Sequence, residues 1–371
     1  MARILYGVSG EGSGHATRSK EILSGLVKKH RVKVLAYGKS YDLLKDCFDT
    51  QKIYGLHLYY RDGSVDYLRT ALANLRRMPA ELDGTLAGVK AVMKRFRPEV
   101  VISDFEPVSG LLARHNQLPL ISLDNQHIFT NCDVKYPRRF AREAGVNRLV
   151  IGAYLPRISE TLITCFYHPR VTRPDTYLFP PILRRAILAQ KPRAGRHVLV
   201  YQTASGDDSI AGALKNCPGE YIFYGCNKDQ RDGNITYRKF SEEGFIKDLA
   251  SCRAVVCNGG LSLMSEALHL GKPIFSVPIA GQFEQIANAY YLEKLGYGRY
   301  RPALTALGLR DFLKNIELYS ANLKKYPRAD NSAIAAKLEE LIAAHAGKIA
   351  LKKPRLIGRM AGKILGWEKK K

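Results

Sequence analysis

Acidic residues are scarce in this sequence. Of 371 residues, 34 are Asp or Glu and 58 are Lys or Arg, so the formal net charge is +24. So basic a chain favours polyanionic partners, namely nucleic acid, anionic lipid headgroups or a phosphate-rich substrate. Long apolar runs are missing too: none approaches the roughly 20 residues that a transmembrane helix needs. The first ten residues, MARILYGVSG, reach a glycine too early for a signal peptide, and we expect a first strand there.

Patterns for metals and disulfides are also missing. The seven cysteines show no CxxC and no Cys/His metal spacing. Their odd number, mostly inside apolar runs, predicts reduced, buried thiols in a cytoplasmic protein. No Asp-x-Asp stands in a plausible metal-binding loop. The first loop, SGEGSGHATRS, lacks a Walker pattern, and Thr17 stands where G-x-G-x-x-G would have its third glycine.

Short β-branched runs alternate with amphipathic stretches along both halves of the chain. Runs such as RILYGVS, PEVVISD, HVLVYQT and RAVVCNGG are continuous and apolar, which is typical of buried parallel strands. This alternation predicts an α/β fold with two doubly wound, Rossmann-like domains. We place an N-terminal domain at 1–185, a C-terminal domain at 196–330, a helix at 331–346 that packs back on the N-terminal domain, and a basic amphipathic tail at 347–371.

The segment from 257 to 298 carries the most specific pattern. A buried strand ends in Gly259-Gly260, which lets the backbone approach a ligand, and Ser262 can cap the following helix. The N-terminus of that helix offers free N–H groups to a phosphate, and Glu266 on the same face can accept both hydroxyls of a ribose. Each feature alone fits an ordinary βαβ unit equally well.

Taken together, GGLSLMSE, GKP and QIANA resemble the donor-nucleotide signature of GT-B glycosyltransferases. The resemblance is to the family-28 branch, which contains the lipid-linked peptidoglycan N-acetylglucosaminyltransferase and monogalactosyldiacylglycerol synthase. It implies two domains facing across a cleft, a UDP-sugar donor, inversion at the anomeric carbon and no essential metal. Phe245, or else Phe240, would pack on the base, and both fit a core position as well. The residues that the resemblance assigns to the donor are Gly14, Thr203, Ser205, Gly206, Phe245, Gly259, Gly260, Leu261, Ser262, Glu266, Gln282, Glu284, Gln285 and Asn288.

The histidine of the first loop is the candidate catalytic group. In the family this loop faces the donor across the cleft, so His15 can act as general base or can donate to the departing phosphate. Asp104, at the carboxyl end of a predicted strand, is either a rival base, the partner that orients His15, or a helix cap. The acceptor-side candidates at the same sheet edge are Glu106, Asp124, Asn125 and His127.

The positive charge suggests a membrane surface. Residues 348–371 carry nine Lys or Arg and one Glu, and a helix there would gather its apolar side chains on one side. The segment 85–97 has an apolar face flanked by bases, although a core helix with a solvated basic side explains it too. KYPRRFAR at 135–142 adds charge to the domain expected to bind the acceptor. The predicted membrane-facing residues are Lys90, Met93, Lys94, Phe96, Arg97, Leu356, Arg359, Met360, Lys363, Ile364 and Trp367.

The leading hypothesis is therefore a glycosyltransferase that uses a nucleotide-sugar donor and a lipid or envelope-glycan acceptor. It would be peripheral on the cytoplasmic face of the membrane, with no nucleic-acid partner. A nucleotide-sugar hydrolase or 2-epimerase fits the same scaffold. A nucleic-acid-binding protein fits the charge but leaves the donor motif without a purpose.

Overall fold

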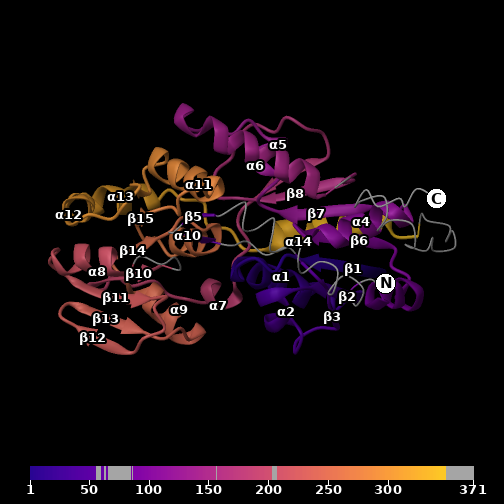
Figure 1. The fold of residues 1–371 in the computed structure, drawn as a ribbon, viewed down its shortest axis with the longest axis horizontal. Helices are drawn as coiled ribbons and strands as arrows, with labels where there is room; N and C mark the ends of the chain where they lie inside the picture. Colours follow the sequence, from indigo (N-terminus) through magenta and orange to yellow (C-terminus); the bar gives the residue numbers. More distant parts are fainter. Residues whose placement is uncertain are drawn as a thin grey trace, which may run out of the picture.

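The computed structural model describes residues 1–55, 60–61, 64–65, 85, 87–155, 157–202 and 207–347. Figure 1 shows two α/β domains side by side, each built on a twisted sheet with helices on its faces. The predicted fold class of two doubly wound domains is confirmed.

The N-terminal domain has a seven-stranded parallel sheet in the order β3-β2-β1-β6-β7-β8-β9. Its strands are β1 (Arg3–Val8), β2 (Arg31–Ala36), β3 (Thr50–Lys52), β6 (Val100–Asp104), β7 (Leu120–Asp124), β8 (Glu160–Thr164) and β9 (Thr176–Phe179). Its helices are α1 (Ser13–Leu26), α2 (Gly38–Leu44), α4 (Pro107–Asn116), α5 (Ile128–Asn131), the 3₁₀ turn η1 (Arg138–Phe140) and α6 (Ala141–Tyr154). A small hairpin pairs β4 (Tyr60–Arg61) with β5 (Ser64–Val65). The order reverses direction at β1, so the polar residues that end β1, β6 and β7 meet at one sheet edge.

The C-terminal domain repeats this plan in the order β12-β13-β11-β10-β14-β15-β16, with only β12 antiparallel to its neighbour. Its strands are β10 (His197–Tyr201), β11 (Glu220–Tyr224), β12 (Gln230–Asp232), β13 (Ile235–Arg238), β14 (Ala254–Cys257), β15 (Ile274–Ser276) and β16 (Gly298–Tyr300). Its helices are α8 (Asp207–Lys215), α9 (Glu242–Ser251), α10 (Leu261–His269), α11 (Phe283–Lys294), α12 (Ala306–Lys314) and α13 (Ile316–Leu323), and α7 (Arg185–Leu188) lies in the linker. Helices α12 and α13 meet at Asn315.

The last described helix, α14 (Ser332–His345), leaves the C-terminal domain and returns to the other one (Figure 1). Ile334, Leu338 and Ile342 are buried in one core cluster with Ile4 and Tyr6 of β1. His30 Nε2 also lies 2.9 Å from Glu339 Oε2. The two domains are therefore connected twice, by the linker and by this helix.

The predicted membrane face at 85–97 is wrong for its apolar residues. The helix spans 87–96, and Met93 is buried in a core cluster with Val89 and Leu35, with Phe96 packed against that cluster. Lys90, Lys94 and Arg97 are exposed on the opposite side. An apolar stripe flanked by bases looks the same in sequence whether it covers a sheet or a membrane, and here it covers the sheet. The predicted tail residues Leu356, Arg359, Met360, Lys363, Ile364 and Trp367 lie outside the described residues. Within the described part of the chain, no helix has the length and apolar character that crossing a bilayer requires.

Candidate functional site

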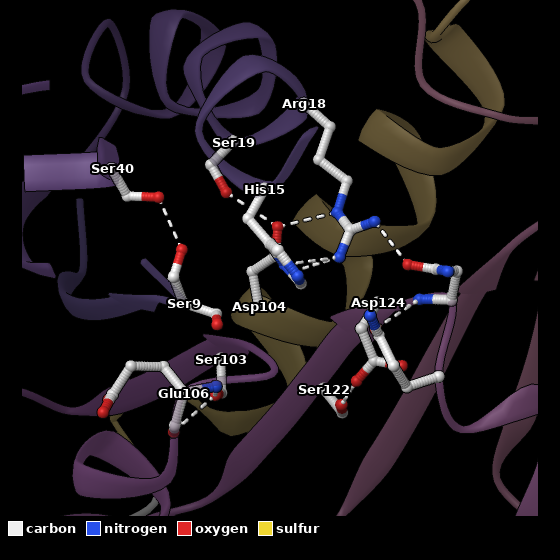
Figure 2. Close-up of polar contacts among 12 residues, drawn as sticks. Ser9, His15, Arg18, Ser19, Ser40, Ser103, Asp104, Glu106, Ser122 and Asp124 are labelled. Carbon is white, nitrogen blue, oxygen red and sulfur yellow. Dashed lines mark hydrogen bonds and ion pairs between the residues drawn. The ribbon is translucent and has the colours of Figure 1, made fainter. Parts of the chain in front are cut away.

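A histidine and an aspartate meet where the first loop reaches the end of β6. Gly12, with φ of 78°, precedes α1, so His15 falls in the first turns of that helix. His15 Nδ1 lies 2.7 Å from Oδ1 of Asp104, the last residue of β6 (Figure 2). Because a carboxylate can only accept, the proton of this bond is on Nδ1, and in the neutral imidazole Nε2 is then the acceptor. This arrangement suits a histidine that takes a proton through Nε2.

Asp104 is fully buried and is hydrogen-bonded to its neighbours. It accepts two hydrogen bonds from Arg18, one of them from Nε at 2.7 Å, and a third from Ser19 Oγ at 2.9 Å (Figure 2). Burial raises the pKa of Asp104, but the charges of Arg18 and His15 and their hydrogen bonds outweigh it and lower the pKa to about 2. Because Asp104 is fully buried and its oxygens are bonded to Arg18, Ser19 and His15, orienting His15 is the role that its geometry allows, rather than that of a base.

Arg18 extends this cluster to the C-terminal domain. Arg18 shares Asp104 with His15, and its Nη1 donates to Asn125 Oδ1 at 2.5 Å. Asn125 Nδ2 in turn donates to Glu284 Oε1 of α11 at 2.7 Å. A continuous chain of polar contacts therefore joins the histidine of one domain to the candidate sugar-binding helix of the other.

The remaining acceptor-side candidates are turned into the N-terminal domain. Glu106 is not exposed and caps α4, because its carboxylate accepts from Val108 N and Ser109 N, both at 2.7 Å. Burial raises the pKa of Glu106 to about 7, although the hydrogen bonds from Ser109 and Val108 oppose the rise. The acceptor-side prediction is wrong for Glu106, because a buried helix cap cannot also contact an acceptor.

Asp124 and His127 form a second buried pair. Asp124 is not exposed and accepts from His127 N at 2.9 Å, with His127 Nδ1 at 2.7 Å from its other oxygen. Burial raises the pKa of Asp124, and the His127 contacts together with a bond from Ser122 lower it below the ordinary value. The pair shapes the turn after β7, so the acceptor-side prediction is wrong for Asp124 and His127 as well. Only Asn125 of the four candidates lies between the domains.

The diglycine turn lies opposite the histidine loop. Gly259 has φ of 98°, and a side chain there would meet Gln285 O at 2.9 Å. A Cβ on Gly14 would lie 2.7 Å from Ser262 Oγ, so the start of α1 and the start of α10 are in direct contact. Gly260, and not Ser262 as predicted, is the N-cap of α10, and it has no side-chain cap bond. The first N–H groups of α10, which include those of Leu261 and Ser262, therefore point at the junction of the domains.

The candidate sugar contacts on α11 are engaged within the protein. Asn288, 2% exposed, donates to Gly259 O at 3.1 Å and so holds the diglycine turn. Gln285 accepts from Ile279 N at 3.0 Å and donates to Gln282 Oε1. The prediction that Asn288 contacts a sugar is wrong, because its amide is used in the turn.

Glu266 forms an ion pair that the sequence did not reveal. Arg184, from the linker, donates to both of its oxygens, from Nε and Nη2, each at 2.7 Å. Arg184 Nη1 also donates to Glu242 Oε1 at 3.0 Å. Burial raises the pKa of Glu266, and the bonds and charge of Arg184 lower it, with a net rise above the ordinary value.

An aromatic cluster lies beside this pair at the start of α9. Phe245 is 4% exposed and packs edge-on against Tyr224, whereas Phe240 is 57% exposed and lies 5.5 Å from Phe245 between ring centroids. The exposed ring is thus Phe240, and the base-packing prediction for Phe245 is wrong because that ring is buried. The predicted phosphate loop residues Thr203, Ser205 and Gly206 lie outside the described residues.

Arg18 and Arg184 are the functional-site residues that sequence reasoning missed. Arg18 lies one helical turn after His15 and faces the same way, which was the available signal. Nothing in the sequence marked Arg184 as a functional residue beyond its place in the basic linker. Within the described ranges, no group of three or more His, Cys, Asp or Glu side chains has an arrangement that could hold a metal ion.

Comparison with known proteins assigns this architecture. The pattern of the family described as "Glycosyl transferase family 1" matches residues 2–317. An uncharacterized glycosyltransferase of Methanosarcina acetivorans is 28% identical over 339 residues, covering 80% of this chain and 85% of the relative. The crystal structure of the kitacinnamycin glycotransferase superimposes with a TM-score of 0.66 at 18% identity, covering 93% of this chain and 99% of that one. Phytolacca americana UGT2, solved with UDP-2fluoro-glucose and pterostilbene, gives 0.66 at 13% identity, with 92% and 99% covered. The two structures share the GT-B fold with this chain.

Proposed function

Because the chain belongs to glycosyl transferase family 1, we propose that it transfers a sugar from a UDP-sugar to a hydroxyl group of a lipid or cell-envelope glycan. The observation that carries the proposal is the His15–Asp104 pair, which lies at the head of α1 where α1 meets the start of α10. A proton acceptor and a set of free backbone donors then face one another across the domain junction. These are the two functions that glycosyl transfer requires.

In the proposed reaction His15 is the general base. Its Nε2 takes the proton of the acceptor hydroxyl while the hydroxyl oxygen bonds to the anomeric carbon of the donor sugar. The bond from that carbon to the diphosphate oxygen breaks as the new bond forms, so UDP leaves with the bonding electrons and the configuration inverts. Asp104 holds the Nδ1 proton at 2.7 Å and stabilises the imidazolium that results.

Departure of UDP requires stabilisation of the diphosphate charge. The uncapped N–H groups at the start of α10, including those of Leu261 and Ser262, would donate to it without a metal ion. Gly260 has no neighbouring atom within 4 Å of a Cβ position, so its backbone leaves room for a phosphate to approach.

The ribose and the base would bind beside Arg184. A carboxylate offers about four acceptor sites, and Arg184 takes one on each oxygen of Glu266, which leaves acceptor capacity for ribose hydroxyls. The exposed ring of Phe240 would pack against the base. The choice of UDP is supported by the Phytolacca americana structure solved with a UDP-sugar and by the GG-x-S-x-x-x-E spacing.

The proposed class of acceptor is inferred from the positive charge of the chain. A formal net charge of +24 favours an anionic surface, such as the cytoplasmic face of a membrane, where a lipid-linked acceptor would be held. The proposal therefore includes a peripheral location on that face and keeps the narrower resemblance to the family-28 branch.

The test is a panel of UDP-, GDP- and TDP-sugars offered with and without a lipid-extract acceptor. We expect transfer with a UDP-sugar, and we expect His15→Ala to lose about 10²–10⁴-fold in turnover while its affinity for UDP stays unchanged. Release of free sugar at the same rate with and without acceptor would favour a hydrolase instead. A His15→Ala variant with full turnover would remove the proposed base.

A further inference from the structure

Helix α6 exposes three large apolar side chains on its outward face. Leu149 is 75% exposed, and Val146 and Val150 are 43% and 47% exposed. On a helical wheel these three lie on one face together with Arg142. A surface helix ordinarily shows the opposite arrangement, with its apolar stripe on the core.

The inward face of the same helix is anchored by Ala144 and Ile151, which are buried in a core cluster. Glu143 Oε2 and Asn147 Oδ1 are buried and have no hydrogen-bond partner among the described residues. Arg148 donates from Nε to Phe129 O at 3.0 Å and so holds this side against α5. The outward apolar face is therefore fixed by packing.

No other helix in the described part of the chain carries more than one exposed large apolar residue; α2, α12 and α13 have one each, Leu43, Leu307 and Leu318. A helix of 14 residues is shorter than the roughly 20 that span a bilayer. It has the dimensions of a helix that lies along a membrane surface.

The charges around this face identify its partner. Arg138 and Arg139 of η1 and Arg142 of α6 are exposed beside the apolar residues, and the nearby Glu143 is turned inward. Pairing this face with a second copy would bring the two sets of arginines together, and three apolar side chains fall short of the roughly 800 Å² per partner of a stable interface. Anionic lipid headgroups complement the arginines, and the acyl boundary accepts the apolar residues.

We propose that η1 and α6 form a docking surface for an anionic membrane, with Val146, Leu149 and Val150 entering the headgroup boundary and Arg138, Arg139 and Arg142 on the lipid headgroups.

The position of this surface matches the proposed reaction, on which its biological meaning rests. Figure 1 shows α6 at the periphery of the N-terminal domain and beside α11 of the other domain. Tyr154, the last residue of α6, stacks on Phe105 at 4.6 Å between centroids, and Phe105 directly follows Asp104.

Flotation of the full chain with vesicles tests the surface. Vesicles of phosphatidylcholine with 30% phosphatidylglycerol are compared with pure phosphatidylcholine at about physiological salt. We expect the parent to bind the anionic vesicles. The partition coefficient should fall at least about tenfold for the variant in which Val146, Leu149 and Val150 are all replaced by Ser. It should fall about fivefold for Arg138→Ser and for Arg142→Ser. Leu307→Ser is the matched control, because Leu307 is 80% exposed in the other domain, and it should bind as the parent does.

Equal binding by the parent and the triple variant would overturn the proposal and assign any binding to other basic segments. A dimer in sedimentation equilibrium that the triple variant converts to monomer would overturn it in favour of a second copy. Flotation and sugar transfer are measured separately. If the parent floats as predicted but transfers no sugar, the proposed function is wrong and the docking surface stands. If the parent transfers sugar but its flotation does not depend on the α6 residues, the docking surface is wrong and the proposed function stands. Circular dichroism of each variant verifies that it is folded.

Discussion

The ion pair between Arg184 and Glu266 gives a sharp prediction on stability. Their side chains are 12% and 5% exposed, and both carboxylate oxygens are bonded at 2.7 Å. The pair joins the linker to α10, so it holds the candidate ribose carboxylate in place. Arg184→Ala would leave Glu266 buried without its cation.

The expected loss of stability in Arg184→Ala follows from the burial of Glu266. Removing one partner of a buried ion pair costs about 3–5 kcal/mol because the other charge stays desolvated. At about 2–4 °C per kcal/mol for a domain of 150–250 residues, the melting temperature should fall by about 6–20 °C. Glu242 bonds the same arginine but is 60% exposed, so Glu242→Gln should cost at most about 1 kcal/mol.

Calorimetry of the four proteins measures this: the parent, Arg184→Ala, Glu242→Gln, and the double variant Arg184→Met with Glu266→Leu. The double variant removes both charges together and should melt near the parent. If Arg184→Ala shifts the melting temperature no more than Glu242→Gln does, the argument from burial is refuted. If the double variant melts as low as Arg184→Ala, the lost stability comes from packing and not from an unpaired charge.

Two further predictions concern the N-terminal domain. Burial raises the pKa of Glu106 to about 7, above the ordinary value of 4.5, so its contribution to stability is present below about pH 4.5 and is lost as pH rises through 7. Urea denaturation from pH 5 to 8 should show the parent losing stability and Glu106→Gln losing less; parallel curves would contradict this. Asn125→Ala removes an acceptor from the buried Arg18 and a donor from Glu284 together, and should cost about 1–3 kcal/mol in the same assay. Gln126→Ala, whose bond to Glu284 is 3.3 Å long, should cost less, and equal losses would count against the interdomain chain of contacts.

The sequence predicted the elements whose patterns are strong. Continuous apolar runs identified β1, β6, β10 and β14. The strands β8 and β9 were missed, as were β12 and β13, because short or half-polar segments resemble loops. Helix α6 was missed for a physical reason: apolar residues lie both on its buried face (Ala144, Ile151) and on its exposed face, so its sequence lacks the usual one-sided signal.

The candidate site was predictable only in part. Glycine-rich turns before helices located His15 and the diglycine turn, because such turns have a local signature. The partners of these loops are distant in sequence: Arg184 and Glu266 are 82 residues apart, and Arg18 and Asn125 are 107 apart. A carboxylate at a sheet edge looks the same in sequence whether it is a cap, as Glu106 is, or an orienting group, as the geometry of Asp104 indicates. Only the three-dimensional arrangement separates them.

The account depends on a histidine that acts across the domain junction from the nucleotide, and one measurement addresses it most directly. Turnover and UDP affinity are determined for the parent and for His15→Ala in the same preparation, with a UDP-sugar and its acceptor at saturation. The account predicts that the dissociation constant for UDP is unchanged and that turnover falls by about 10²–10⁴-fold. Equal turnover in the two proteins, or a loss of UDP binding that accounts for the whole defect, would contradict it.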